Sequence, residues 1–86
     1  MPKDEKVDFS GIISLMDELL NDSSIPRNVR MNIDSAKKKL ECDDEDSVKI
    51  SHAIYLLDDV SHDINLPIHV RTMMWNILSE LESLKN

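Results

Sequence analysis

The feature of this sequence that most restricts its fold is an internal repeat. Residues 54–82 match residues 13–41 at a constant offset of 41 positions (54 − 13 = 41), in one register that holds through most of the chain. Both copies contain the signature D-x-x-I/L-P-x-N/H-V-R, which begins at Asp22 and again at Asp63. Such a run of matches indicates duplication of one supersecondary unit. An 86-residue chain is too short for two domains, so we expect a single domain spanning residues 1–86.

The spacing of apolar residues predicts four helices. Intervals of three and four residues place the first helix over about residues 7–21. Pro26, with its fixed φ angle and missing N–H, suits the start of a second helix that ends near Glu41. The third helix begins inside the acidic stretch 43–46, because carboxylates favour the positive end of the helix dipole, and the fourth follows Pro67. An aromatic content of only 3% also favours helices over strands.

Two architectures can bury the apolar stripes of these helices. We favour an all-α four-helix bundle built from two duplicated αα-hairpins that pack together. The alternative is a pair of stacked HEAT-like repeats, whose period of about 40–47 residues fits the offset and whose open edge would need a partner. The expected buried positions are Phe9, Ile12, Ile13, Met16, Leu19, Leu20, Val29, Ile33, Ala36, Leu40, Ile50, Ala53, Ile54, Leu57, Val60, Val70, Met74, Ile77, Leu81 and Leu84.

Charge and cysteine content restrict the partners and the compartment. A formal net charge of −7 opposes direct binding to nucleic acid or to anionic membranes, which depends on Lys and Arg. No apolar run is long enough to span a membrane, and residues 1–6 lack the apolar region of a signal peptide. The single cysteine, Cys42, cannot form an internal disulfide. We therefore expect a cytoplasmic protein.

The sequence offers no positive sign of catalysis. Its only glycine, Gly11, cannot form a glycine-rich phosphate loop, and acids on both sides of Cys42 disfavour a thiolate nucleophile. His52, His62 and His69 lack the spacing of metal ligands, and their counterparts in the first half are not histidines. The acidic stretch also lacks the glycine and the final glutamate of an EF-hand. We expect no catalytic residue, no cofactor and no metal.

The signature itself predicts a structural role. Its Asp should bond backbone N–H groups of the turn, and its Arg should reach a carboxylate such as Asp17 or Asp58. A catalytic device seldom needs two equivalent copies in one small chain. The residues of this motif are Asp22, Pro26 and Arg30 in the first half and Asp63, Pro67 and Arg71 in the second.

The fourth helix is apolar over a wider arc than the second. Trp75, Met73 and Leu78 align with Asp34, Asn32 and Lys37. This difference predicts either that the last helix is the more enclosed one, which we favour, or that Trp75, Met73 and Leu78 form a surface for a protein partner or a homodimer.

The motifs of both halves resemble a known family. Ala53-Ile54-Tyr55-Leu56-Leu57-Asp58-Asp59, Leu66-Pro67-Ile68-His69-Val70-Arg71, Trp75-Asn76-Ile77 and Ile25-Pro26-Arg27-Asn28-Val29-Arg30 are similar to segments of the archaeal uncharacterised protein family 0147. The resemblance covers nearly the whole chain. It implies a compact four-helix bundle of archaeal cytoplasmic origin, and no activity, cofactor or catalytic residue comes with it.

The function predicted from the sequence is correspondingly general. We expect a non-enzymatic interaction or structural module that presents the fourth helix, or the grooves of the repeat, to another protein. The alternative is a helical bundle that binds a small ligand or a metal, or an enzyme with an unrecognised site. Either would require convergent polar residues in a pocket between helices.

Overall fold

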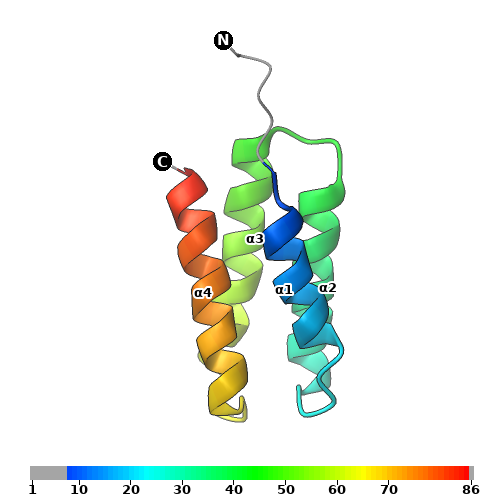
Figure 1. Ribbon diagram of the computed structural model, residues 1–86, viewed down its shortest axis with the longest axis vertical. Helices are drawn as coiled ribbons and strands as arrows, with labels where there is room; N and C mark the ends of the chain where they lie inside the picture. Colours follow the sequence, from blue (N-terminus) through cyan, green and yellow to red (C-terminus); the bar gives the residue numbers. More distant parts are fainter. Residues whose placement is uncertain (1–7, 86) are drawn as a thin grey trace.

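The computed structural model describes residues 8–85. Four antiparallel helices run along one axis: α1 (Ser10–Leu20), α2 (Arg27–Glu41), α3 (Asp46–Ser61) and α4 (Ile68–Lys85). Figure 1 shows the α1–α2 and α3–α4 turns at one end, and the α2–α3 connection at the other. The all-α prediction is confirmed, and the predicted residue 7 at the start of the first helix lies outside the described residues.

The four helices form a closed ring. Each helix contacts the next one along the chain, and α1 also contacts α4 (Figure 1). Within residues 8–85 the backbones of the diagonal pairs, α1 with α3 and α2 with α4, do not pack directly against each other, since no Cα atoms of these pairs lie within 8 Å. Stacked HEAT-like repeats would place equivalent helices side by side, whereas here they lie across the ring. The four-helix bundle is therefore confirmed, and the stacked alternative is wrong. The duplication itself stays a prediction.

Proline sets the start of the second helix of each hairpin. Pro26 has the extended conformation of an N-cap (φ −60°, ψ 154°), and its carbonyl accepts the N–H of Arg30 at 2.9 Å. The carbonyl of Pro67 accepts the N–H of Arg71 at 3.0 Å. Each proline thus stands immediately before its helix, where its missing N–H costs no hydrogen bond.

The acidic stretch 43–46 contains the start of α3, as predicted, since α3 begins at Asp46. The side chain of Glu45, the N-cap residue, makes no capping hydrogen bond. Asp44 instead pairs with Lys39 of α2 at 2.7 Å. Asp44 of the acidic stretch therefore links the α2–α3 connection to α2 by an ion pair.

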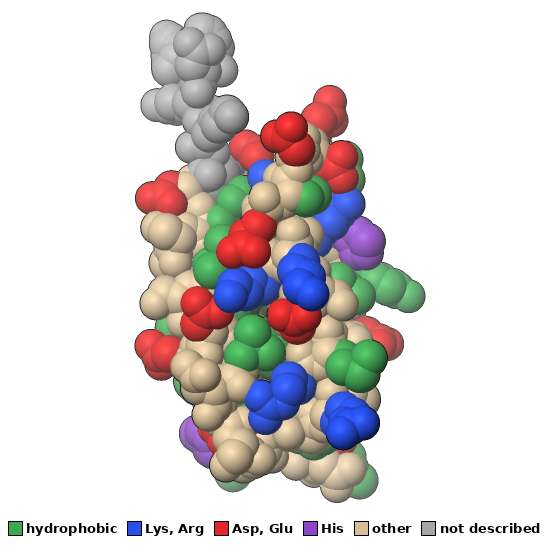
Figure 2. All heavy atoms as spheres, turned by 90° about the vertical axis from the view of Figure 1, so that its right-hand side faces the viewer, with side chains coloured by type: hydrophobic (Ala, Val, Ile, Leu, Met, Phe, Trp, Pro, Cys, Tyr) green, Lys and Arg blue, Asp and Glu red, His purple; other side chains and the backbone are tan. Residues whose placement is uncertain are grey.

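The outer side of α2 is charged, and its lysines pair with carboxylates of the same chain. Figure 2 shows Lys and Arg side chains interleaved with Asp and Glu on this side of the molecule. Lys37 pairs with Asp17 of α1 at 2.6 Å, and Lys38 pairs with Asp34 at 3.1 Å. Exposed ion pairs of this kind stabilise the fold little, but they keep the outer side of the first hairpin hydrated.

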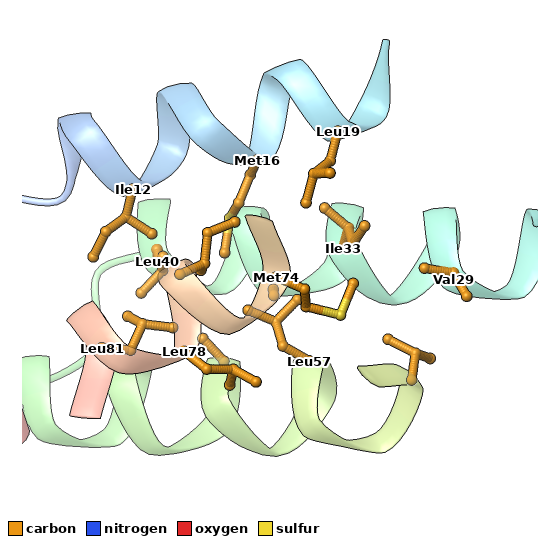
Figure 3. Close-up of a cluster of buried hydrophobic side chains, with 14 of the residues drawn as sticks. Ile12, Met16, Leu19, Val29, Ile33, Leu40, Leu57, Met74, Leu78 and Leu81 are labelled. Atoms are coloured by element: carbon orange, nitrogen blue, oxygen red, sulfur yellow. The ribbon is translucent and has the colours of Figure 1, made fainter. Parts of the chain in front are cut away.

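The core fills the centre of the ring. Figure 3 shows Met16 of α1 and Leu57 of α3 pointing toward Met74 of α4. Of the expected buried positions, Ile13, Leu20 and Ile54 are partly buried and pack against the core, and Leu84 is wrong because it is 39% exposed near the end of α4. The others are buried.

Two core residues were not predicted. Ile25 and Leu66, which precede the two prolines, are also buried. They carry the I/L position of the signature, and they close the core at the end of the bundle where the two hairpin turns lie.

Among the described residues, no helix is both long enough and apolar enough to cross a bilayer.

Candidate interaction surface

The Asp of each signature caps its own turn, as predicted. The carboxylate of Asp22 accepts the backbone N–H of Ser24 at 2.9 Å and the Ser24 hydroxyl at 2.6 Å. The carboxylate of Asp63 accepts the backbone N–H of Asn65 at 2.8 Å. An Asp that bonds the backbone two residues onward fixes a turn without help from the rest of the fold.

The Arg of each signature does not reach a carboxylate, so that part of the prediction is wrong. Arg30 donates to the carbonyls of Leu20 and Asp22, the latter at 3.0 Å, and Arg71 donates to the carbonyl of Asp63 at 3.2 Å. Leu20 is the last residue of α1, and the last carbonyls of a helix have no partner inside it. The carbonyls of Asp22 and Asp63 lie in the turns, where each also accepts a backbone N–H three residues onward.

The carboxylates suggested for these arginines bond elsewhere. Asp17 pairs with Lys37, and Asp58 lies 3.7 Å from His62. The Nε atom of Arg71 is buried without a hydrogen-bond partner, so Arg71 is less completely bonded than Arg30.

The two turns are also joined to each other. Nε2 of His69, at the start of α4, lies 2.6 Å from the carboxylate of Asp22, and Asn28 of α2 donates to the carboxylate of Asp63 at 3.4 Å. Asn28 and His69 are equivalent positions in the repeat. The hydroxyl and N–H of Ser24, and after them His69, lower the pKa of Asp22 from 3.8 to about 2. The N/H position of the signature therefore holds a donor for the opposite turn, which sequence reasoning missed.

The candidate metal ligands are dispersed. Among residues 8–85, no three His, Cys, Asp or Glu side chains come together in a way that could hold a metal ion. His62 lies beside Asp58, His69 beside Asp22, and His52 lines an open hollow between α2 and α3. Cys42 is half-buried, with its Sγ atom 3.7 Å from a carboxylate oxygen of Asp44.

Of the three residues of the predicted patch on α4, two are buried or partly buried and one is exposed. Leu78 is buried at 8% exposure, and Met73 is partly buried against the core, so neither belongs to an open surface. Trp75 is 55% exposed. The expectation of a more enclosed fourth helix is therefore right for Met73 and Leu78 and wrong for Trp75.

Exposed apolar side chains concentrate on the second hairpin. Of seven large apolar residues exposed in the described part of the chain, only Met31 lies on the first hairpin. The six on the second are Val48, Tyr55, Ile64, Ile68, Trp75 and Leu84. Sequence reasoning missed Tyr55, Ile64 and Ile68, although their alignment with Ser14, Ser23 and Arg27 was a signal that could have found them.

Trp75 and Ile68 lie on the flank of α4 that faces α3. Glu80 and Leu84 line a hollow with Gly11 and Ile12, so their flank faces α1. Helical periodicity puts Ile68, Arg71 and Trp75 on the opposite flank. The bond from Arg71 to the turn that follows α3 agrees with this placement.

Tyr55 lies on α3 at the same height as Trp75. Seven residues separate Trp75 from the start of α4 at Ile68 (75 − 68 = 7), and seven separate Ile54 from the end of α3 at Ser61 (61 − 54 = 7). Because the helices are antiparallel, these positions are level. Ile54 is partly buried, and Tyr55, the next residue, is exposed. Tyr55 lies on the outer side of α3, and α3 packs against α4. We call Tyr55 together with Ile68 and Trp75 of the neighbouring helix the aromatic face.

The outer side of α3 is hollowed next to this face. Ser47, Val48, Ser51, His52 and Tyr55 line an open depression of about 570 Å³. The depression is shallow and lies along one helix. It is therefore suited to a side chain of another macromolecule rather than to an enclosed small ligand.

The ring of four helices and the two linked turns define a small all-α protein of the four-helix-bundle class. The chain belongs to an uncharacterised protein family, UPF0147, whose model matches residues 1–84. The resemblance found in the sequence is thus confirmed, and the family has no known function.

Similar proteins come from archaea. A UPF0147 protein of Methanocaldococcus jannaschii is 42% identical over 78 residues, which cover 90% of this chain and 84% of that protein. A UPF0147 protein of Archaeoglobus fulgidus is 44% identical over 77 residues, covering 90% and 88%. The crystal structure of a UPF0147 protein from Thermoplasma acidophilum matches with a TM-score of 0.82 at 35% identity, covering 88% of this chain and 91% of that one. That of a protein of unknown function, MMP1188, matches at 0.86 and 41%, covering 95% and 99%.

Proposed function

We propose that this protein is a non-enzymatic interaction module that binds another protein through the aromatic face. The observation that carries the proposal is the difference between the two hairpins. Both pack into the same ring, yet only the second exposes large aromatic side chains.

The first hairpin serves as an internal control for the needs of the fold. Its residues aligned with Tyr55 and Trp75 are Ser14 and Asp34, and the residue aligned with Ile68 is Arg27. These polar residues occupy equivalent places on a hairpin that buries its own core residues fully. The fold therefore does not require apolar side chains at these positions, and a different requirement accounts for them.

Binding to a protein is a requirement that fits. Tryptophan and tyrosine dominate the residues that contribute most to protein interfaces, because they bury a large area at a low cost in side-chain entropy. The polar groups of the turns are bonded to the backbone and to each other, so the aromatic face is the prominent feature that the described fold does not use. We place this module in the cytoplasm, since a single cysteine provides no internal disulfide.

Site-directed photo-crosslinking tests the proposal. A photoreactive residue replaces Trp75 in one variant and Met31 in another, because Met31 is similarly exposed but lies on α2. We expect a protein from a lysate of the source organism to crosslink at position 75 and not at position 31. Equal crosslinking at both positions, or none at position 75, would contradict the proposal.

A further inference from the structure

We infer that the aromatic face binds a basic amphipathic helix of another protein, an inference that rests on the proposed function. The helical form follows from the geometry of the face. Ile68 and Trp75 are seven residues apart on α4, which places them two turns apart on one flank, about 10 Å along the axis. A third helix that packs along this flank can contact it with side chains spaced at i, i+3, i+4 and i+7.

Acidic residues lie beside and beyond this apolar face. Asp58 is three residues before the end of α3, on the flank that faces α4, and is therefore level with the middle of the face, between Ile68 and Trp75. Glu82 is seven residues after Trp75 on the same flank of α4 and is exposed. A complementary helix has apolar residues along one side and Lys or Arg next to them.

The acids of this hairpin outnumber its cations. Residues 46–85 contain six Asp and Glu and three Lys and Arg, which are Lys49, Arg71 and Lys85. Lys49 is paired with Asp46, and Lys85 is the last residue of α4. Arg71 is half-buried and bonds the carbonyl of Asp63. The field over the aromatic face is therefore negative, and it favours a basic partner in both association rate and specificity.

A second copy of the chain fits this face poorly. If two aromatic faces met, the acids around one would oppose the acids around the other, and like charges at an interface are unfavourable. Most basic side chains on α2 do not supply the complement, because Lys37, Lys38 and Lys39 are paired with Asp17, Asp34 and Asp44 of the same chain. Arg27, at the start of α2, is the exposed exception.

Trp75 makes the inference directly measurable. It is the only tryptophan and is half-exposed, so its emission shifts to the blue when a partner covers it. The full chain is titrated with a helical Leu/Lys peptide of about 16 residues, and with a matched peptide that has Glu in place of every Lys. We expect a saturable blue shift with the Leu/Lys peptide and at least roughly tenfold weaker binding of the Leu/Glu peptide. Equal binding of both peptides overturns the inference.

Matched variants locate the binding. Tyr55→Ser introduces the residue that the first hairpin has at the equivalent position and leaves the Trp75 reporter in place. Met31→Thr introduces into α2 the residue that the second hairpin has at the equivalent position, Thr72, and serves as the control. We expect the first variant to weaken binding of the Leu/Lys peptide by about tenfold or more, and the second to leave it unchanged. The double variant Asp58→Asn, Glu82→Gln should weaken binding and reduce its salt dependence, and an unchanged affinity overturns the basic character of the partner.

The crosslinking experiment separates this inference from the proposed function. A protein captured from position 75 whose crosslinked segment is acidic, or lacks helical apolar spacing, overturns the inference and leaves the interaction module standing. Capture of a second copy of the chain at that position likewise overturns the inference and leaves the interaction module standing. Absence of crosslinking at position 75 overturns both.

Discussion

The two hairpins of this bundle share an interior and differ in their exterior. Ile33 and Met74 are equivalent in the repeat, and both are fully buried. Asp34 and Trp75, the next residue in each hairpin, are also equivalent, yet one forms an ion pair with Lys38 and the other is an exposed aromatic. One fold thus accommodates opposite surfaces, and this difference is the basis of the proposed interaction surface.

At the turns, in contrast, the two hairpins differ in residue type but make the same kind of contact. Each turn Asp bonds a side chain of the other hairpin, but the donor is Asn28 in one case and His69 in the other. The residue type differs between the two turns, and the contact is present in both. Under the proposed function, positions that keep the contact serve the fold, and positions of opposite polarity serve recognition.

The largest effects are expected in the shared core. Ile33→Ala and Met74→Ala should each lower the free energy of unfolding by about 2–5 kcal/mol, because each leaves a cavity among fully buried side chains. Urea unfolding followed by circular dichroism measures both. A loss below about 1 kcal/mol for only one of them would break the equivalence of the two interiors.

Substitution of the signature arginines should give the next largest losses of stability, and the loss should be larger in one hairpin than in the other. Arg30→Ala and Arg71→Ala should each cost about 1–3 kcal/mol, because each removes side-chain hydrogen bonds to the carbonyls of its hairpin turn. Arg30→Ala should cost more, because Arg30 bonds two carbonyls and Arg71 one. Thermal unfolding, with Lys85→Ala as an exposed control, decides the order. If both arginine variants melt like the wild type, their structural role is refuted.

The turn carboxylate should make stability depend on pH. The pKa of Asp22 is about 2 in the folded protein and its ordinary value is 3.8, so ionised Asp22 stabilises the fold above about pH 4, and this contribution is lost as the pH falls toward 2. The charged groups that face it are His69 from α4 and Arg30, which bonds its carbonyl.

Asp22→Asn isolates this effect. The difference in unfolding free energy between wild type and variant should shrink between pH 4 and pH 2, as measured by urea titration at each pH. A difference that stays constant over this range would show that the turn does not depend on the charge of Asp22.

The smallest effects on stability are expected on the aromatic face. Tyr55→Ser should change the free energy of unfolding by no more than about 0.5 kcal/mol, since Tyr55 is largely exposed and both residues have similar helix propensity. Ser14→Tyr is the reciprocal substitution and should be equally mild. A large loss from Tyr55→Ser would mean that the fold uses this side chain, and the contrast between the hairpins would lose its functional meaning.

The sequence predicted what depends on local pattern. Periodicity located the helices and most of the core, and Pro26 and Pro67 marked the start of α2 and α4. It could not decide whether Trp75 was buried, because a wide apolar arc satisfies either a crowded interior or a contact surface. The prediction of the arginine partners was wrong because their acceptors are backbone carbonyls, which every residue has and which the sequence therefore does not distinguish.

The bond between Asp22 and His69 had no local signal either. Its partners lie 47 positions apart, and only the ring brings them together. The ring itself depends on which helices touch, which periodicity does not specify.

The exchange of bonds between the turns has a further consequence. Asp22 of the first hairpin binds the second, and Asp63 of the second binds the first, as in an isologous interface between two subunits of a C2 dimer. The pairing of α2 with α3 and of α4 with α1 obeys the same pseudo-symmetry. The molecule is in this sense a dimer carried on one chain, with residues 42–45 as the tether between its subunits. Two hairpins separated by cutting that tether would retain every contact that holds them together, and their dissociation constant would measure the strength of the fold.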